Sequence, residues 1–123
     1  DIYSRPMFEE MGFTREHFQN GYSSFAVEDS LRYLKEFLLG EKIYPRFRIE
    51  NFNRKLIHIV GILLNEEGQL ASISETIIVH VDMKARKTVE MPKEFLAKLQ
   101  TIKKKHHQTG EIDFDLRLKI RSR

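Results

Sequence analysis

Cysteine is absent from the 123 residues of this chain. Without thiols, the chain can form no disulfide, hold no thiolate-bound metal and use no cysteine nucleophile. The sequence also lacks a Gly-x-Ser-x-Gly elbow, so a serine hydrolase of the familiar covalent kind is not expected. The lack of cysteine suits a reducing compartment, and we expect the protein to work in the cytoplasm.

Long hydrophobic runs are missing as well. The longest nearly apolar stretch, Leu56 to Leu64, is too short to cross a bilayer and is interrupted by His58. No basic-then-apolar leader opens the sequence, which begins with Asp1 rather than Met. We therefore expect no secretion signal, and we treat the chain as a fragment or a processed protein.

Charge of one sign is only slightly in excess, with 21 basic and 18 acidic residues and a formal net charge of +3. Such a balance helps to attract a phosphorylated ligand but falls short of a nucleic-acid signature. The hydrophobic share is 41% and the charged share 32%. This composition predicts one globular domain over residues 1–123.

Helical periodicity occurs at the start and in the last third of the sequence. Ser4 can cap a first helix that Gly12 ends, and residues 14–18 predict a further helical turn. Pro92 opens a later helix, and three lysines close it where the helix dipole favours cations. The apolar stripe of that helix consists of Phe95, Leu96, Leu99 and Ile102.

Between these helices the sequence alternates in the manner of β-strands. Strands are predicted over residues 22–38, with a bulge near Asp29, and over residues 43–50, 55–64 and 69–83. One face of the first strand is expected to hold Phe25, Val27, Leu31 and Tyr33. Residues 112–120 alternate so regularly that they predict a last strand, joined to an edge of the sheet. The fold class is therefore α+β, with a helix, four antiparallel strands, an extra C-terminal helix and a final strand.

Four stretches stand in a distinctive order. They are residues 25–40 (FAVEDSLRYLKEFLLG), 54–58 (RKLIH), 67–71 (EGQLA) and 75–83 (ETIIVHVDM), with Pro92 beyond. Together they resemble the 4-hydroxybenzoyl-CoA thioesterase-like branch of the hotdog superfamily, over roughly residues 7–100. The resemblance is nearest to the thioesterases of carnitine and betainyl-CoA metabolism.

This resemblance implies a hotdog fold, in which an antiparallel sheet wraps around a helix. It implies a dimeric assembly and the hydrolysis of an acyl-CoA thioester, and we expect no cofactor. It also implies a first strand and a turn similar to Asp-x-Asn-Gly-His ahead of the helix, where many relatives hold a catalytic Asp. Neither motif occurs in these 123 residues, and residues 110–123 have no expected counterpart in the family.

Three side chains are candidates for catalysis. Glu28 can activate water against a thioester carbonyl, or it can be a solvated strand residue paired with Arg32. Glu75 falls in phase with a row of Ile and Val, so it is either an acid–base group or a structural ion pair or inter-subunit contact. His58 is either a catalyst or a satisfied core residue or dimer contact.

Basic residues flank the predicted strand ends. The candidates for gripping the phosphates of coenzyme A are Arg54, Lys55, Lys84 and Arg86. The alternative is that they are ordinary solvated turn charges. His80 and Asp82 have the strand spacing of a metal pair, but no third ligand stands nearby, so no metal site is expected.

Other assemblies and other classes of function remain open. A homodimer or homotetramer is expected because Leu56 to Leu64 is apolar on both faces and needs a cover. Lys103 to Lys105 and the basic residues of 117–123 could form a nucleic-acid patch, but no aromatic residue is interleaved and Asp113 and Asp115 dilute the charge. Nucleic acid is therefore not the expected partner. The main alternative is a hotdog subunit without chemistry that binds acyl-CoA or a partner protein.

Overall fold

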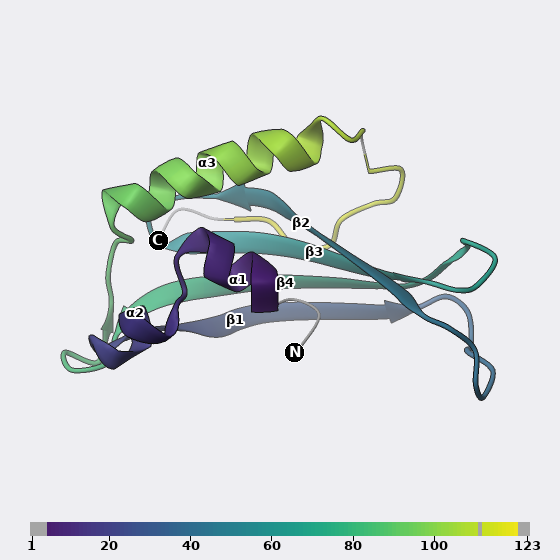
Figure 1. Ribbon diagram of the computed structural model, residues 1–123, viewed down its shortest axis with the longest axis horizontal. Coiled ribbons are helices and arrows are strands. Elements are labelled where there is room, and N and C mark those ends of the chain that lie inside the picture. Colours follow the sequence, from purple (N-terminus) through teal and green to yellow (C-terminus); the bar gives the residue numbers. More distant parts are fainter. Residues whose placement is uncertain (1–4, 111, 121–123) are drawn as a thin grey trace.

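The sheet in this computed structural model, which describes residues 5–110 and 112–120, has four long antiparallel strands in the order β1-β4-β3-β2 (Figure 1). They are β1 (Tyr22–Tyr33), β2 (Tyr44–Phe52), β3 (Leu56–Leu64) and β4 (Leu70–Asp82). A short strand that was not predicted, β5 (Lys87–Thr88), pairs with the end of β4. The predicted antiparallel arrangement of four strands is confirmed, and Pro45 lies on the edge strand β2 as its lack of an N–H requires.

Within the described residues, three helices accompany the sheet. They are α1 (Arg5–Met11), α2 (Arg15–Gln19) and α3 (Lys93–His107). Gly12 ends α1 with a φ of +120°, and a Cβ at this position would lie 2.5 Å from the ring of Phe95. The predicted cap at Ser4 lies outside the described residues. In the described part of the chain, no helix is long and apolar enough to cross a membrane.

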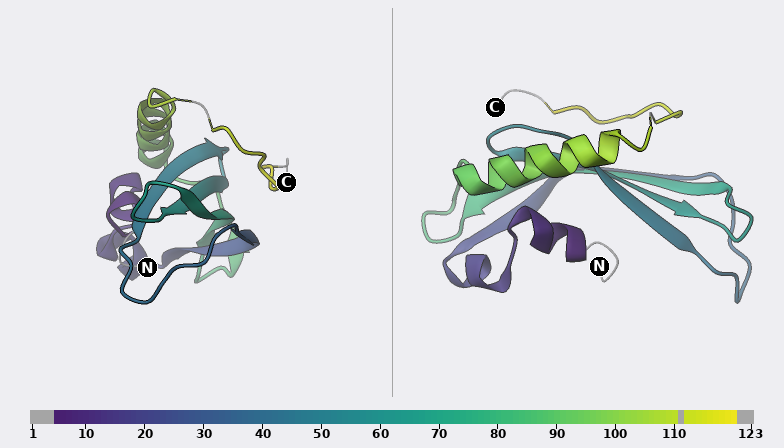
Figure 2. Two further views of the ribbon diagram at one scale, coloured as in Figure 1. Left: turned by 90° about the vertical axis from the view of Figure 1, so that its right-hand side faces the viewer. Right: turned by 45° about the horizontal axis from the view of Figure 1, so that its top comes forward.

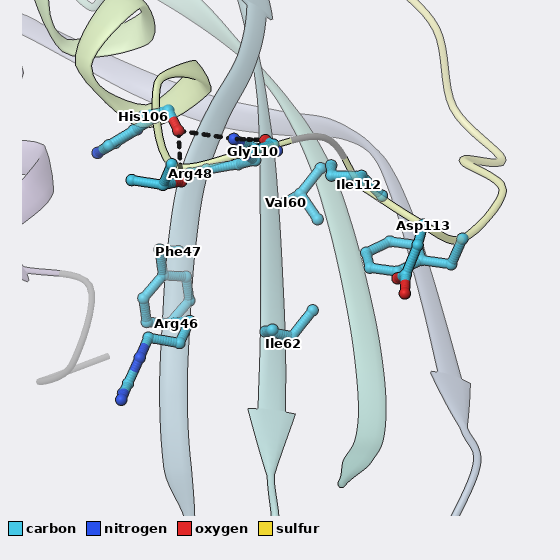
Figure 3. A pocket seen from close by; sticks show the side chains of 11 residues that line it. Arg46, Phe47, Arg48, Val60, Ile62, His106, Gly110, Ile112 and Asp113 are labelled. Atoms are coloured by element: carbon cyan, nitrogen blue, oxygen red, sulfur yellow. Dashed lines mark hydrogen bonds between the residues drawn. The ribbon is translucent and has the colours of Figure 1, made fainter. Parts of the chain in front are cut away.

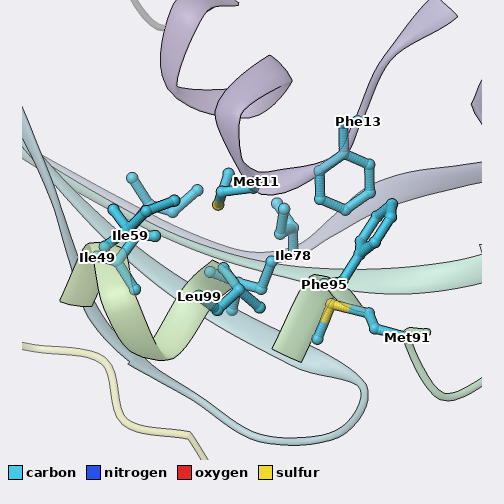
Figure 4. Packing of buried hydrophobic residues seen from close by; sticks show 10 residues of the cluster. Met11, Phe13, Ile49, Ile59, Ile78, Met91, Phe95 and Leu99 are labelled. Atoms are coloured by element: carbon cyan, nitrogen blue, oxygen red, sulfur yellow. The ribbon is translucent and has the colours of Figure 1, made fainter. Parts of the chain in front are cut away.

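The main core lies between the helices and one face of the sheet, which we call the inner face. This face carries Ile57, Ile59 and Ile78, and α3 packs against it through Phe95 and Leu99 (Figure 4). Met11 and Leu99 are fully buried, which shows that α1 and α3 close the core together. The predicted apolar stripe of the later helix is thus the surface that covers the sheet.

A bulge in β1 differs in place from the prediction. The pairing of β1 with β4 shifts between Ala26 and Glu28, so Val27 is the extra residue, and not a residue near Asp29. Phe25 lies opposite Val79 on one face, whereas Leu31 lies opposite Ser74 on the other face. The predicted single face of Phe25, Val27, Leu31 and Tyr33 is therefore wrong, because the extra residue inverts the alternation after it.

The opposite face, which we call the outer face, carries Leu56, His58, Glu75, Ile77 and Val79. Residues 112–120, which we call the C-terminal segment, cross this face on the side away from the helices (Figure 2).

The predicted strand over residues 112–120 is wrong, because the segment is extended but is not part of the sheet. Its alternation arises because every second side chain faces the sheet. Both faces of β3 are therefore covered within one chain, and the argument that they need a partner as cover no longer holds.

Candidate active site

Three predicted catalytic residues lie on the outer face of neighbouring strands. Glu28 of β1 is opposite Ile77 of β4, and Ile77 is opposite His58 of β3. Glu28 and His58 therefore flank Ile77, about 10 Å apart across two strand spacings. Glu75 lies on the same face of β4, two residues before Ile77.

Glu75 is the centre of a buried polar network, and its side chain is 0% exposed. His58 Nε2 lies 3.1 Å from Oε1, and Arg32 Nη2 lies 3.5 Å from Oε2. The backbone N–H groups of Arg117 and Leu118 donate to Oε2 and Oε1 at 2.8 and 3.1 Å. Because donors occupy both oxygens, this carboxylate is arranged to hold its neighbours in place rather than to accept a proton from water.

Glu28 occupies a different environment. It is half-buried on the edge strand β1, directly after the bulge at Val27. The hypothesis that Arg32 pairs with Glu28 meets a competing contact, because Arg32 makes its ion pair with Glu75 and donates to the carbonyl of Asp115 at 2.6 Å. Glu28 is therefore the more accessible of the two carboxylates.

A cavity of about 410 Å³ opens near Glu28, at the end of the outer face where β3 begins; we call it the basic cavity. Its floor includes Val27, Leu56 and Val79, and Arg54 and Lys55 stand on one side. Arg54 is largely exposed and lies 3.4 Å from Glu90 Oε1. A cation at the rim of an apolar cavity suits a ligand with a chain and an anionic head.

Lys84 and Arg86 lie in the turn between β4 and β5, at the same end of the sheet as Arg54 and Lys55. They do not line the basic cavity. Both are exposed, so their positive charge acts on a ligand only at the mouth of this end.

A second groove, of about 510 Å³, was not predicted; we call it the arginine groove. It lies between the outer face and the chain that leaves α3, and Val60, Ile62 and Arg46 line it (Figure 3). Arg48 Nη2 donates to the carbonyls of His106 and Gly110 at 2.7 and 3.0 Å and so holds the connection to the C-terminal segment. Burial lowers the pKa of His106 from its usual 6.5, and the charge of Arg48 lowers it further.

His80 and Asp82, which have the strand spacing of a metal pair, bind different partners in the structure. Asp82 Oδ1 accepts from the N–H groups of Lys84 and Ala85, which closes the turn after β4. His80 is buried on the inner face, where its Nε2 lies 2.9 Å from Nε2 of His17. Sequence periodicity gave no signal for this contact, because its partners are 63 residues apart and meet only after α2 folds back.

The sequence profile of the Thioesterase-like superfamily matches residues 4–99. Among curated proteins, the L-carnitine dehydrogenase/betainyl-CoA thioesterase of Rhizobium meliloti is 30% identical over 89% of this chain and 22% of that protein. The betainyl-CoA thioesterase of Pseudomonas aeruginosa is 28% identical over 71% of this chain and 55% of that protein. The chain thus spans about a fifth of the first relative and about half of the second.

Solved structures show the same fold. A Staphylococcus aureus protein in complex with CoA superposes with a TM-score of 0.82 at 22% identity, over 98% of this chain and 77% of that chain. The DHNA-CoA thioesterase of Staphylococcus aureus superposes with a TM-score of 0.74 at 15% identity, over 87% of this chain and 74% of that chain. The expected hotdog arrangement, an antiparallel sheet packed on a helix, is confirmed.

Proposed function

The chain belongs to the thioesterase-like superfamily, and on that premise we propose that it hydrolyses an acyl-CoA thioester to a free acid and coenzyme A. The observation that carries the proposal is the order in which the basic cavity and the candidate catalytic residues lie along the outer face. The basic cavity with Arg54 and Lys55 lies at one end of this face. Glu28 and His58 lie beside Ile77, two residues along β4 from Val79 in the cavity floor. An acyl-CoA molecule carries its phosphorylated head and its reactive thioester in the same order, joined by the pantetheine arm.

In the proposed reaction, Glu28 is the general base. It takes a proton from a water molecule while the water oxygen forms a bond to the thioester carbonyl carbon. The carbon–sulfur bond then breaks, and the CoA thiolate leaves and takes up a proton. A thiolate is a good leaving group, so one positioned carboxylate and an N–H donor for the carbonyl oxygen suffice.

His58 and Glu75 support this site in the proposal. Glu75 accepts a hydrogen bond from His58 Nε2 and so fixes the imidazole beside Ile77, across from Glu28. His58 is the candidate to contact the substrate, whereas Glu75 positions it. Arg54 and Lys55 bind the phosphates, and Lys84 and Arg86 add positive potential at the mouth.

We propose that the active form is a homodimer or homotetramer. The edge of β1 supports this, since no strand pairs with it among the described residues and its apolar side chains are exposed. A cytoplasmic location also belongs to the proposal and suits a chain without cysteine.

The test is thiol release from a panel of acyl-CoA esters of different length and charge, with CoA binding measured in parallel by calorimetry. Turnover of at least one ester supports the proposal. Binding of CoA without turnover of any ester would assign the chain to the non-catalytic class, and the absence of both would remove acyl-CoA as the ligand.

A further inference from the structure

The C-terminal segment crosses the outer face with few polar attachments. Arg32 Nη2 donates to the carbonyl of Asp115 at 2.6 Å, and Glu75 accepts from the N–H groups of Arg117 and Leu118. These three hydrogen bonds come from two side chains on adjacent strands, so they form one clasp. Since the segment has no ladder of strand hydrogen bonds, opening the clasp would free it from the sheet without breaking any strand pairing.

Apolar contacts hold the end of the segment. Leu118 and Ile120 pack on the cluster formed by Leu56, Ile77 and Val79, together with Val81. Leu56 and Val79 also belong to the floor of the basic cavity. The segment therefore rests on the surface that leads from Arg54 and Lys55 to Glu28.

The start of the segment borders the other cavity. Ile112 and Phe114 line the arginine groove, where Val60 and Ile62 of β3 form the floor. One face of the sheet thus carries a cavity at each end of the segment, and the segment fills the space between them. We call the part of the outer face between the two cavities, which the segment covers, the outer-face channel.

We infer that the C-terminal segment is a displaceable cover that competes with acyl-CoA for the outer-face channel. This inference rests on the proposed function. The pantetheine arm of CoA is an extended chain that joins the phosphates to the thioester, so it would lie on Leu56, Ile77 and Val79, where Leu118 and Ile120 pack when the segment is closed. When the segment lifts, the channel opens from the basic cavity to Glu28, and when it closes, it keeps water from the apolar floor.

The chain has no cysteine, which allows a direct test of this movement. Leu118→Cys places a single thiol under the segment, and Glu67→Cys places one in the exposed turn between β3 and β4 as a control. The probe is a non-hydrolysable thioether analogue of acetyl-CoA, which has no free thiol. We expect the analogue to raise the labelling rate of the Leu118→Cys thiol by about tenfold and to leave the Glu67→Cys thiol unchanged. An unchanged rate for the Leu118→Cys thiol, with the analogue bound by calorimetry, would overturn the inference.

Leu118→Ser tests the competition itself, because it weakens the cover without altering Glu28, Arg54 or Lys55. We expect the Kd of the analogue and the KM to fall by about tenfold, with kcat unchanged. Lys119→Ser is the matched control, since Lys119 is exposed on the same segment, and a thermal melt verifies that both variants fold. Equal Kd values for wild type and Leu118→Ser would overturn the cover and leave the proposed function standing. If neither protein binds the analogue or cleaves any ester, the proposed function fails and the competition fails with it.

Discussion

At the scale of single residues, the two carboxylates of the outer face differ in accessibility. Glu75 is saturated with donors under the C-terminal segment, whereas Glu28 is half-buried on an edge strand. Both lie on the outer face of adjacent strands, two positions apart along the strand direction, so their different surroundings support different proposed roles. The greater accessibility of Glu28 supports the proposal that it is the general base.

Glu28→Gln should therefore lower kcat by about 100-fold or more, since a positioned general base typically contributes about 10²–10⁴-fold to the rate. The amide keeps the shape of the side chain, so the fold and CoA binding should remain. Steady-state thiol release and calorimetry measure the two effects separately. Unchanged turnover would leave the family membership intact and remove Glu28 as the base.

Glu75→Gln is the matched comparison. It should lower the free energy of unfolding by about 3 kcal/mol, because the amide lacks the negative charge that pairs with Arg32 and turns an NH2 donor toward other donors. Turnover should change less than in Glu28→Gln. Urea unfolding gives the stability, and a loss of activity larger than that of Glu28→Gln would show that Glu75 takes part in the chemistry.

The pair of His17 and His80 predicts how stability depends on pH. His80 Nδ1 lies 3.1 Å from the carbonyl of Val89, so we assign its proton there and let its Nε2 accept from His17. Burial lowers the pKa of both rings below 6.5, and the neighbouring His80 lowers the pKa of His17 further. As the pH falls below about 6.5, the unfolded chain binds protons that the folded chain does not, so stability decreases.

The free energy of unfolding should thus be lower at pH 5.5 than at pH 7.5. His17→Phe should reduce this difference, because Phe can stack on Tyr22 as His17 does, at a ring distance of 5.0 Å, without titrating. His106, whose pKa is also lowered, should keep part of the dependence in the variant. Equal pH dependence in wild type and His17→Phe, measured by urea unfolding, would contradict the assignment.

At the scale of elements, α3 carries much of the inner core. Its apolar stripe was predictable from the 3.6-residue period, and the structure buries Phe95, Leu99 and Ile102 as that period requires. Leu99 has no exposed surface and packs in the same cluster as Met11 and Ile78. This helix therefore determines how well the sheet is closed on its inner side.

Leu99→Ala should lower the free energy of unfolding by about 2–5 kcal/mol, because it leaves a cavity at the centre of this cluster. Lys98→Ala, on the exposed side of the same helix, should change it by less than about 0.5 kcal/mol. Urea unfolding of the two variants measures both values. Similar values for the two variants would mean that α3 does not dock as described.

The four main strands and α3 could be predicted because their periodicity is local. The C-terminal segment could not, since alternation shows only that one side of a chain is covered. Ile112, Leu118 and Ile120 would alternate in the same way at a sheet edge or across a sheet face. The candidate residues of the site could be chosen by their type, but their contacts could not be predicted. The contact of His58 with Glu75 depends on the register of β3 and β4, and the clasp depends on where residues 115–118 cross the sheet.

At the scale of the whole molecule, the edge of β1 is the feature that supports the proposed assembly. Every residue of β1 except Val27 pairs with β4, and no other strand pairs with β1 among the described residues. Around this edge Phe25, Leu31 and Tyr33 are 51%, 53% and 79% exposed. A long bare strand with exposed apolar side chains on both faces invites further pairing.

A second copy of the chain is the simplest partner, because two β1 strands can pair antiparallel about a twofold axis and bury the same residues from each chain. We expect a dimer at micromolar concentration in light scattering. Leu31→Lys should weaken it by at least about tenfold, since a lysine would have to lose its hydration in the contact. Tyr44→Lys is the control, because Tyr44 is also exposed but lies on β2, at the opposite edge of the sheet. A monomeric wild type would contradict the dimer, and a dimer that weakens equally in both variants would place the contact elsewhere.

If the β1 edge is the contact, Glu28 lies beside it, and dilution below the dimer Kd should reduce turnover together with the amount of dimer.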